Sequence, residues 1–228
     1  MRESICVTGM ILRQTPVGEC DRRICLLTKE RGKIAAFARG ARRPTGKLAA
    51  ATNPFSFGRY WLAEGRDSYT VCEAQIQSYF EELRTDYIGA CYGMYFAEVA
   101  DYYTRENNDE SQMLKLLYQS LRAVTAPALS RRLVKCVFEL KAIAVNGEFS
   151  TDPAMALGMG QEKGLEESTR YALHYIAAST VEKLYTFTVN DTVLGQLEQI
   201  SKAYCRRCMD RDFKTLAVLK TLAATKLT

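Results

Sequence analysis

The chain has 228 residues, of which 47% are hydrophobic and 25% are charged. This balance is ordinary for a globular protein and excludes wholesale disorder, and no apolar run approaches the roughly 18 residues of a membrane span. The net charge of +5 is unevenly distributed: residues 1–79 contain 13 Lys and Arg against 7 Asp and Glu, whereas residues 80–228 contain 18 against 19. The sequence therefore predicts a basic N-terminal domain, residues 1–79, followed by an electrically balanced domain, residues 80–228.

The first 14 residues predict a strand and not a signal peptide, because their apolar run is short and ends at Arg13. The eight cysteines fit a reducing compartment, since a chain of this size does not need disulfides to fold. We therefore expect a cytoplasmic protein without membrane association.

Five short strands are predicted in the first domain. β-Branched and apolar residues fill the first three, and alternating side chains mark the last two. The strands cover residues 4–12, 23–28, 33–38, 55–62 and 69–76. With one helical turn at residues 47–51, this order predicts a closed five-stranded barrel of the OB-fold type.

After Ser78 the spacing of the apolar residues becomes helical. Apolar stripes at three- and four-residue intervals run through residues 87–102, 113–124, 129–144, 197–208 and 213–220. Gly147 is placed to end the third of these helices, and Asp191 to begin the fourth. The fold class is therefore α+β, an OB-fold barrel followed by an α-helical domain.

Residues 148–190 interrupt this helical pattern and are expected to form a small irregular insert. Three glycines between residues 158 and 164 predict a loop. Tyr171, Leu173 and Tyr175 then alternate with other residues, which predicts one strand.

Residues 38–47 read ARGARRPTGK, four cations among glycines and a proline that disfavour a helix. No carboxylate occurs from residue 31 to residue 63. The stretch differs from a phosphate-binding P-loop, because five residues instead of four separate Gly40 from Gly46, and Leu48 replaces the Ser or Thr that binds magnesium. An ordinary solvated loop is one interpretation. We favour a polyanion-binding surface, because guanidinium groups bind phosphate oxygens in a forked geometry.

The predicted phosphate contacts fall into two groups. Arg39, Arg42, Arg43 and Lys47 come first, and Lys33, Arg22 and Arg23 extend the patch onto neighbouring strands. Aromatic residues at positions 37, 55, 57, 60 and 61 are available to stack on bases. The alternative is that they fill the barrel, which we expect for Phe55 and Phe57.

No catalytic or metal-binding arrangement is recognised in the sequence. Cys205 and Cys208 form a lone CxxC, whereas a structural zinc site needs four ligands, so we expect these cysteines to pack within a helix. His174, the only histidine, has no identifiable nucleophile or carboxylate partner and is expected to be structural. The sequence thus predicts a binding protein, not an enzyme, without a metal or another cofactor.

A long N-terminal segment, residues 8–57, carries a specific combination of turns and basic residues. It reads TGMILRQTPVGECDRRICLLTKERGKIAAFARGARRPTGKLAAATNPFSF. Shorter stretches accompany it: Phe138-Glu139-Leu140-Lys141, Asn146-Gly147-Glu148, residues 181–185 and Phe213-Lys214. Together these stretches resemble the RecO family of bacterial recombination mediators in DNA repair.

The resemblance implies an N-terminal OB-fold, binding of single- and double-stranded DNA, and annealing of complementary strands. It also implies work with RecR, recognition of the C-terminal tail of single-strand binding protein, and loading of the recombinase, in a nucleoid-associated role. Many family members carry a four-cysteine zinc motif after the central helix. Residues 148–204 contain no cysteine, so zinc is not expected here.

One helix combines cations with apolar residues and is a candidate for binding the acidic, aromatic-ended tail of single-strand binding protein. Its residues are Arg131, Arg132, Lys135 and Phe138; equally, the cations could simply be solvated. An alternative to DNA binding as a whole is a scaffold whose basic barrel docks on an acidic protein.

Overall fold

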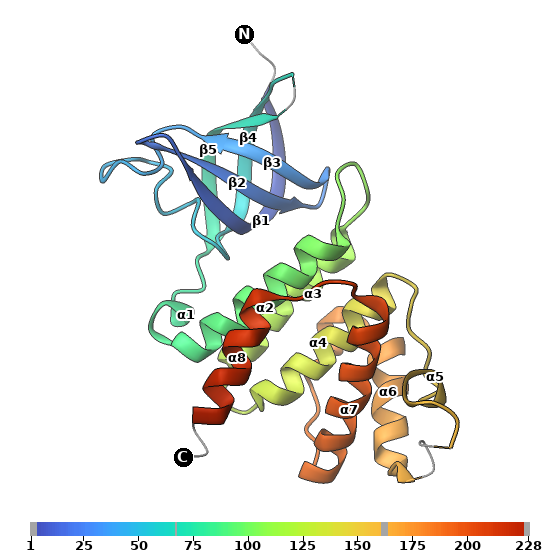
Figure 1. The fold of residues 1–228 in the computed structure, drawn as a ribbon. Coiled ribbons are helices and arrows are strands. Elements are labelled where there is room, and N and C mark those ends of the chain that lie inside the picture. Colours follow the sequence, from blue (N-terminus) through green and yellow to red (C-terminus); the bar gives the residue numbers. More distant parts are fainter. Residues whose placement is uncertain (1–3, 67, 161–163, 226–228) are drawn as a thin grey trace. The chain divides into compact units, whose positions relative to one another are not determined.

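The computed structural model describes residues 4–66, 68–160 and 164–225. The chain divides into two compact units, Met1–Leu114 and Lys115–Thr228. Five strands come first in the chain and helices follow them (Figure 1). In the described part of the chain, no helix is both long and apolar enough to cross a membrane.

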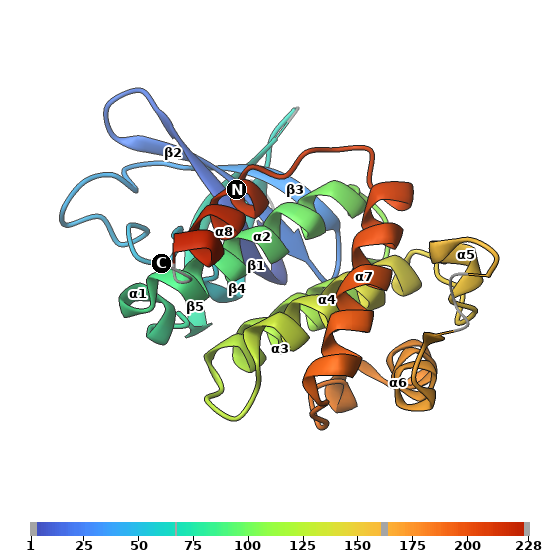
Figure 2. The ribbon, with the colours of Figure 1, turned by 60° about the horizontal axis from the view of Figure 1, so that its bottom comes forward.

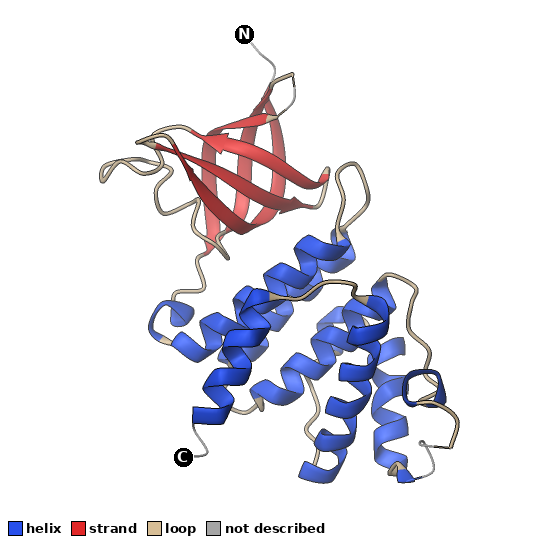
Figure 3. Cartoon of the chain, in the orientation of Figure 1, coloured by secondary structure: helices blue, strands red, loops and turns tan. Residues whose placement is uncertain are grey.

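The five strands of the first unit close into a barrel (Figure 3). They are β1 (Ser4–Val17), β2 (Asp21–Thr28), β3 (Gly32–Ala38), β4 (Phe57–Glu64) and β5 (Tyr69–Ser78). The order around the barrel is β1-β2-β3-β5-β4, with antiparallel neighbours except for a short parallel pair between β3 and β5. β1 is long enough, at 14 residues, to pair with β4 through its first part and with β2 through its second. The predicted barrel is confirmed.

Alternating side chains fill the barrel, as the strand period requires. On β4, Tyr60 and Leu62 are fully buried, whereas Arg59 is exposed and Trp61 is half-buried. Other core residues are Val7, Ile11, Ile24, Leu26, Ile34, Ala36 and Val71. The Tyr60 hydroxyl lies 2.9 Å from the carbonyl oxygen of Ser56, and burial raises the pKa of this phenol.

Two helices complete the first unit, α1 (Glu82–Thr85) and α2 (Tyr87–Tyr103). The Asp86 carboxylate caps α2 by accepting a hydrogen bond of 2.9 Å from the Gly89 N–H. Near the other end of α2, Asp101 Oδ1 lies 3.0 Å from Lys33 Nζ of β3. An ion pair therefore joins this helix to the barrel.

The second unit, Lys115–Thr228, is helical. Its elements are α3 (Ser111–Thr125, which begins just before the unit boundary), α4 (Arg131–Val145), α5 (Ala154–Leu157), α6 (Glu167–Ala178), the 3-10 turn Val181–Lys183, α7 (Asp191–Cys208) and α8 (Lys214–Thr225). α4 packs against α6 and α7 (Figure 2). Gly147 follows α4 with a φ of 77°, the left-handed conformation expected of a C-terminal glycine. The residue that caps α7 is Asn190 and not Asp191, because the Asn190 side chain accepts a hydrogen bond from the Val193 N–H.

Two charged residues of α4, Glu139 and Lys141, are buried. Glu139 is 1% exposed; it is ion-paired with Lys135 at 2.7 Å and accepts a hydrogen bond from the Ser201 hydroxyl of α7. Lys141 is 8% exposed and donates to the carbonyl oxygens of Ala177 and Ser179, at the end of α6. Burial lowers the pKa of Lys141. These two side chains therefore connect the central helix to its two neighbours.

The strand predicted at Tyr171, Leu173 and Tyr175 is wrong, because these residues lie on α6. The buried residues of this segment are Thr169, Ala172, Leu173 and Ile176, whose spacing of three and four residues is helical. Tyr171 is 71% exposed. Its apparent alternation with Leu173 therefore does not mark the two faces of a strand.

Candidate nucleic-acid interface

Residues 39–56, between β3 and β4, form what we call the basic loop, which projects from the barrel (Figure 1). Its backbone follows a series of tight turns. The Gly46 N–H donates to Arg43 O at 2.9 Å, the Ala49 N–H to Gly46 O at 2.9 Å, and the Thr52 N–H to Leu48 O at 3.1 Å. The last of these is the single helical turn that the sequence predicts after Gly46.

Two glycines shape the first half of the basic loop. Gly40 has a φ of 67°, and its N–H donates to Asp21 Oδ1 at 2.8 Å. At Gly46, a Cβ atom would lie 2.4 Å from the carbonyl oxygen of Gly40. Larger residues at these positions would therefore disturb the turns that carry the cations.

The four first-choice cations, Arg39, Arg42, Arg43 and Lys47, are all exposed. Arg42 is fixed beside the β1–β2 turn, because its N–H donates to Cys20 O and its Nη1 to Gly18 O, both at 2.8 Å. A hydrogen bond with the Cys20 thiol raises the pKa of Arg43. The structure thus holds the backbone in place and leaves the charged groups accessible to solvent.

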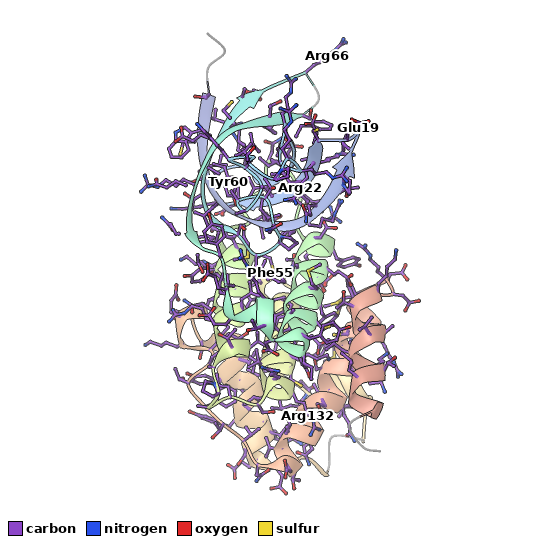
Figure 4. The ribbon with its side chains drawn as sticks, turned by 90° about the vertical axis from the view of Figure 1, so that its left-hand side faces the viewer. Glu19, Arg22, Phe55, Tyr60, Arg66 and Arg132 are labelled. Carbon is purple, nitrogen blue, oxygen red and sulfur yellow. The ribbon has the colours of Figure 1, made fainter. Side chains whose placement is uncertain are left out.

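Arg22 behaves differently from these four residues. It lies among the strands of the barrel, whereas Arg66 projects from one end (Figure 4). Arg22 Nη1 donates to three acceptors of the basic loop: Ala49 O at 2.7 Å, Thr52 Oγ1 at 2.9 Å and Asn53 Oδ1 at 3.2 Å. Burial, followed by the charge of Arg42, lowers the pKa of Arg22. This guanidinium therefore anchors the basic loop to β2.

Replacing Arg22 by methionine is expected to lower the free energy of unfolding by about 1.5–3 kcal/mol, because hydrogen bonds from a charged donor to the loop are lost. Unfolding in urea, followed by the fluorescence of Trp61, measures this change. The matched control is Arg23→Met, the same change at an exposed neighbour, which should stay within about 0.5 kcal/mol of the wild type. Equal stabilities of the two variants would contradict the anchoring role.

Of the other second-group cations, Lys33 is engaged within the first unit and Arg23 is exposed. Lys33 Nζ also donates to the backbone oxygen of Asp101, and Arg13 Nε lies 3.6 Å from Asp101 Oδ2. Burial alone would raise the pKa of Asp101, but the hydrogen bond and charge of Lys33 hold it below its ordinary value. Arg23 therefore extends the exposed patch, whereas Lys33 is paired.

The five aromatic residues divide between the interior and the surface. Tyr60 is fully buried and Phe55 is 8% exposed, as expected for barrel filling. Phe37, Phe57 and Trp61 are half-buried, so the expectation that Phe57 fills the core is only partly met.

Of the residues predicted to bind the tail of single-strand binding protein, one is buried and the three cations have partners within the second unit. Phe138 is fully buried. Both Arg132 Nε and Arg132 Nη2 donate to the Glu198 carboxylate of α7, Lys135 is paired with Glu139, and Arg131 Nε donates to Val124 O. Arg131 and Arg132 therefore join α4 to α3 and α7, whereas Lys135 is paired within α4.

Cys205 and Cys208 lie at the end of α7, as the apolar stripe predicts. Burial raises the pKa of both thiols, which disfavours the thiolate form that binds metals. Within the residues that the structure describes, no group of three or more His, Cys, Asp or Glu side chains is placed to hold a metal ion. His174 is exposed on α6.

Comparison with known proteins gives matches along most of the chain. Residues 1–80 match the family described as Recombination protein O N terminal, and residues 84–149 match Recombination protein O C terminal. The first match contains the barrel and the basic loop, and the second contains α2, α3 and α4.

Individual relatives give the same result. The chain is 27% identical to the DNA repair protein RecO of Acetivibrio thermocellus, over 96% of this chain and 97% of that protein. It is 35% identical to the DNA repair protein RecO of Symbiobacterium thermophilum, over 68% and 61%, and 27% identical to that of Alkaliphilus metalliredigens, over 94% and 98%. The chain therefore belongs to the RecO family of DNA repair proteins.

Proposed function

We propose that this protein binds single- and double-stranded DNA through the basic loop and anneals complementary strands, without catalysing bond chemistry. The observation that supports this most directly is the exposure of Arg39, Arg42, Arg43 and Lys47 on an anchored loop. The absence of any carboxylate from residue 31 to residue 63 adds to it. Arg23 extends the contact along β2.

Annealing by such a surface depends on charge. Two complementary strands repel each other through their phosphates, and a cationic surface reduces this repulsion by releasing condensed counterions. The contacts go to the backbone, so the base edges stay available for pairing and little sequence preference is expected.

Within the proposal, the protein acts with RecR on DNA coated by single-strand binding protein and helps to load the recombinase, in the cytoplasm and at the nucleoid. Membership of the RecO family supports this role. The cations of α4 are engaged within the second unit. Recognition of the C-terminal tail of single-strand binding protein therefore requires either a different surface or a rearrangement of these ion pairs.

A salt series with purified protein tests the proposal. The logarithm of the affinity for single-stranded DNA should fall linearly with the logarithm of the salt concentration, with a slope of about −0.7 for each phosphate contact. Four contacts then predict a slope near −3, and annealing rates should fall over the same range. An affinity independent of salt would contradict the proposal. A partner whose co-purification survives nuclease treatment, together with no DNA affinity, would favour the acidic-protein scaffold instead.

A further inference from the structure

A pocket of about 480 Å³ lies in the first unit where the basic loop ends. It is lined by the last residues of the loop, by Tyr79 and Phe80, which follow β5, and by helices α1 and α2. Its walls are mainly apolar and include Phe55, Phe80 and Met94. Phe55 marks the end of the barrel where the pocket lies (Figure 4). Such a space suits a flat, apolar group.

The backbone at this pocket is strained. Phe55 has a φ of 71° and Phe80 a φ of 49°, and they are two of the three non-glycine residues with positive φ in the described part of the chain. The Phe55 N–H donates to Ile11 O at 2.9 Å, which holds this conformation against β1. Residues kept in unfavourable conformations cluster at binding sites.

The rim of the pocket carries a cation beside an aromatic ring. The Arg84 guanidinium carbon lies 5.8 Å from the centre of the Tyr79 ring, and the Arg84 side chain is exposed. The pocket is also continuous with the basic loop, because Asn53, Pro54 and Phe55 belong to both. The end of the basic loop therefore lines the pocket, and Arg84 adds a cation to its lining.

We propose that this pocket accepts an unpaired base of single-stranded DNA. The phosphates on either side of the base would contact Arg84 and the cations of the basic loop, and the base would stack on Tyr79 or on the phenylalanine walls. Bases of a duplex are paired and do not reach the pocket, so it confers a preference for single strands. This inference rests on the proposed function, since it assumes that DNA binds the basic loop.

Filling the pocket tests the inference. Ala90 of α2 lines it, and Ala90→Leu occupies part of the space with a helix-compatible side chain. The affinity for an oligonucleotide single strand should fall about tenfold, whereas affinity for a duplex of the same sequence should not change. Ala178→Leu, the same change at an exposed position of α6, is the matched control and should alter neither affinity. Thermal unfolding checks that both variants are folded.

A fluorescent base gives a second measurement that does not depend on filling the pocket. A single strand containing 2-aminopurine should lose fluorescence on binding, because the base stacks on an aromatic ring. Tyr79→Leu keeps the wall apolar but removes a ring, and should restore part of the fluorescence. Arg84→Ala should lower single-strand affinity about threefold, since one phosphate contact is lost.

The outcomes separate this inference from the proposed function. If the wild type binds neither single strands nor duplexes, both fail. If DNA binds but Ala90→Leu leaves the ratio of single-strand to duplex affinity unchanged, only the pocket inference is overturned. The pocket inference is also overturned if Ala90→Leu loses affinity for an acidic peptide but keeps its affinity for oligonucleotides, because the pocket then serves a protein partner.

Discussion

Replacing Arg42 and Arg43 by glutamate is expected to abolish strand annealing while the barrel stays folded. The double variant changes the net charge by −4, from +5 to +1, at two adjacent exposed cations of the basic loop. Two phosphate contacts are lost and two repulsive charges are added, so the affinity for single strands should fall on the order of 100-fold at moderate salt. The slope of affinity against salt should fall by about 1.4. A fluorescent annealing assay and a binding titration measure both effects.

The control for this variant is a charge reversal of equal size elsewhere. Lys202 and Arg206 lie one turn apart on α7 and are both exposed. Lys202→Glu with Arg206→Glu also changes the net charge by −4, and should lower affinity only through the weaker long-range field. If the two double variants lose affinity equally, the net charge and not the basic loop determines DNA binding.

The largest effect on stability is expected from Lys135→Met in the second unit. This change removes the cation paired with the Glu139 carboxylate, whose side chain is only 2% exposed. Breaking a buried ion pair from one side costs about 3–5 kcal/mol, because the remaining charge is left without its compensating partner. Unfolding by urea measures the loss. Adding Glu139→Leu should restore most of it, since replacing both charges by apolar groups is often nearly neutral.

The stability that Lys135 contributes to the wild type should depend on pH. Burial alone would lower the pKa of Lys135, but the Glu139 carboxylate raises it above the ordinary lysine value of 10.5. A lysine whose pKa rises on folding stabilises the protein fully at pH values below its pKa in the unfolded chain. This contribution is lost as the pH rises through its pKa in the folded protein. The difference between wild type and Lys135→Met should therefore shrink above about pH 10.5. Lys202→Met at an exposed position is the matched control and should show little change at any pH. A difference that grows in alkali would contradict the pairing.

Much of the fold is predictable because the barrel strands and most helices bury one face. The alternation of Tyr60 and Leu62 with exposed Arg59 identifies β4, and the apolar stripe of α7 identifies that helix. The error at α6 has a physical cause. Tyr171 is apolar enough to look buried, but it is exposed and stacks on Tyr175, with ring centres 6.5 Å apart. Residue type alone does not show that an aromatic ring packs along a helix surface.

The positive charge of the candidate site is predictable from the sequence, but the hydrogen bonds that hold the basic loop in place are not. The sequence shows seven cations and no carboxylate between residues 31 and 63, and it correctly leads to an exposed group on the basic loop. It does not show which arginine turns inward, because Arg22 and Arg23 are chemically identical neighbours. The acceptors of Arg22 lie 27 to 31 residues away in the chain. The roles of Asp21, Thr52 and Asn53 were missed for the same reason, since such contacts exist only after the barrel has closed.

The hydrogen bonds of Arg22 have a consequence for the thermodynamics of binding. Because folding has already fixed the basic loop, contact with DNA need not order a flexible segment, and the interface is preorganised. Association should then be governed mainly by ion release and show only a small change in heat capacity, unlike coupled folding and binding. In the Arg22→Met protein, ordering of the loop would move from the folding step to the binding step, and a larger entropic cost should appear in calorimetry.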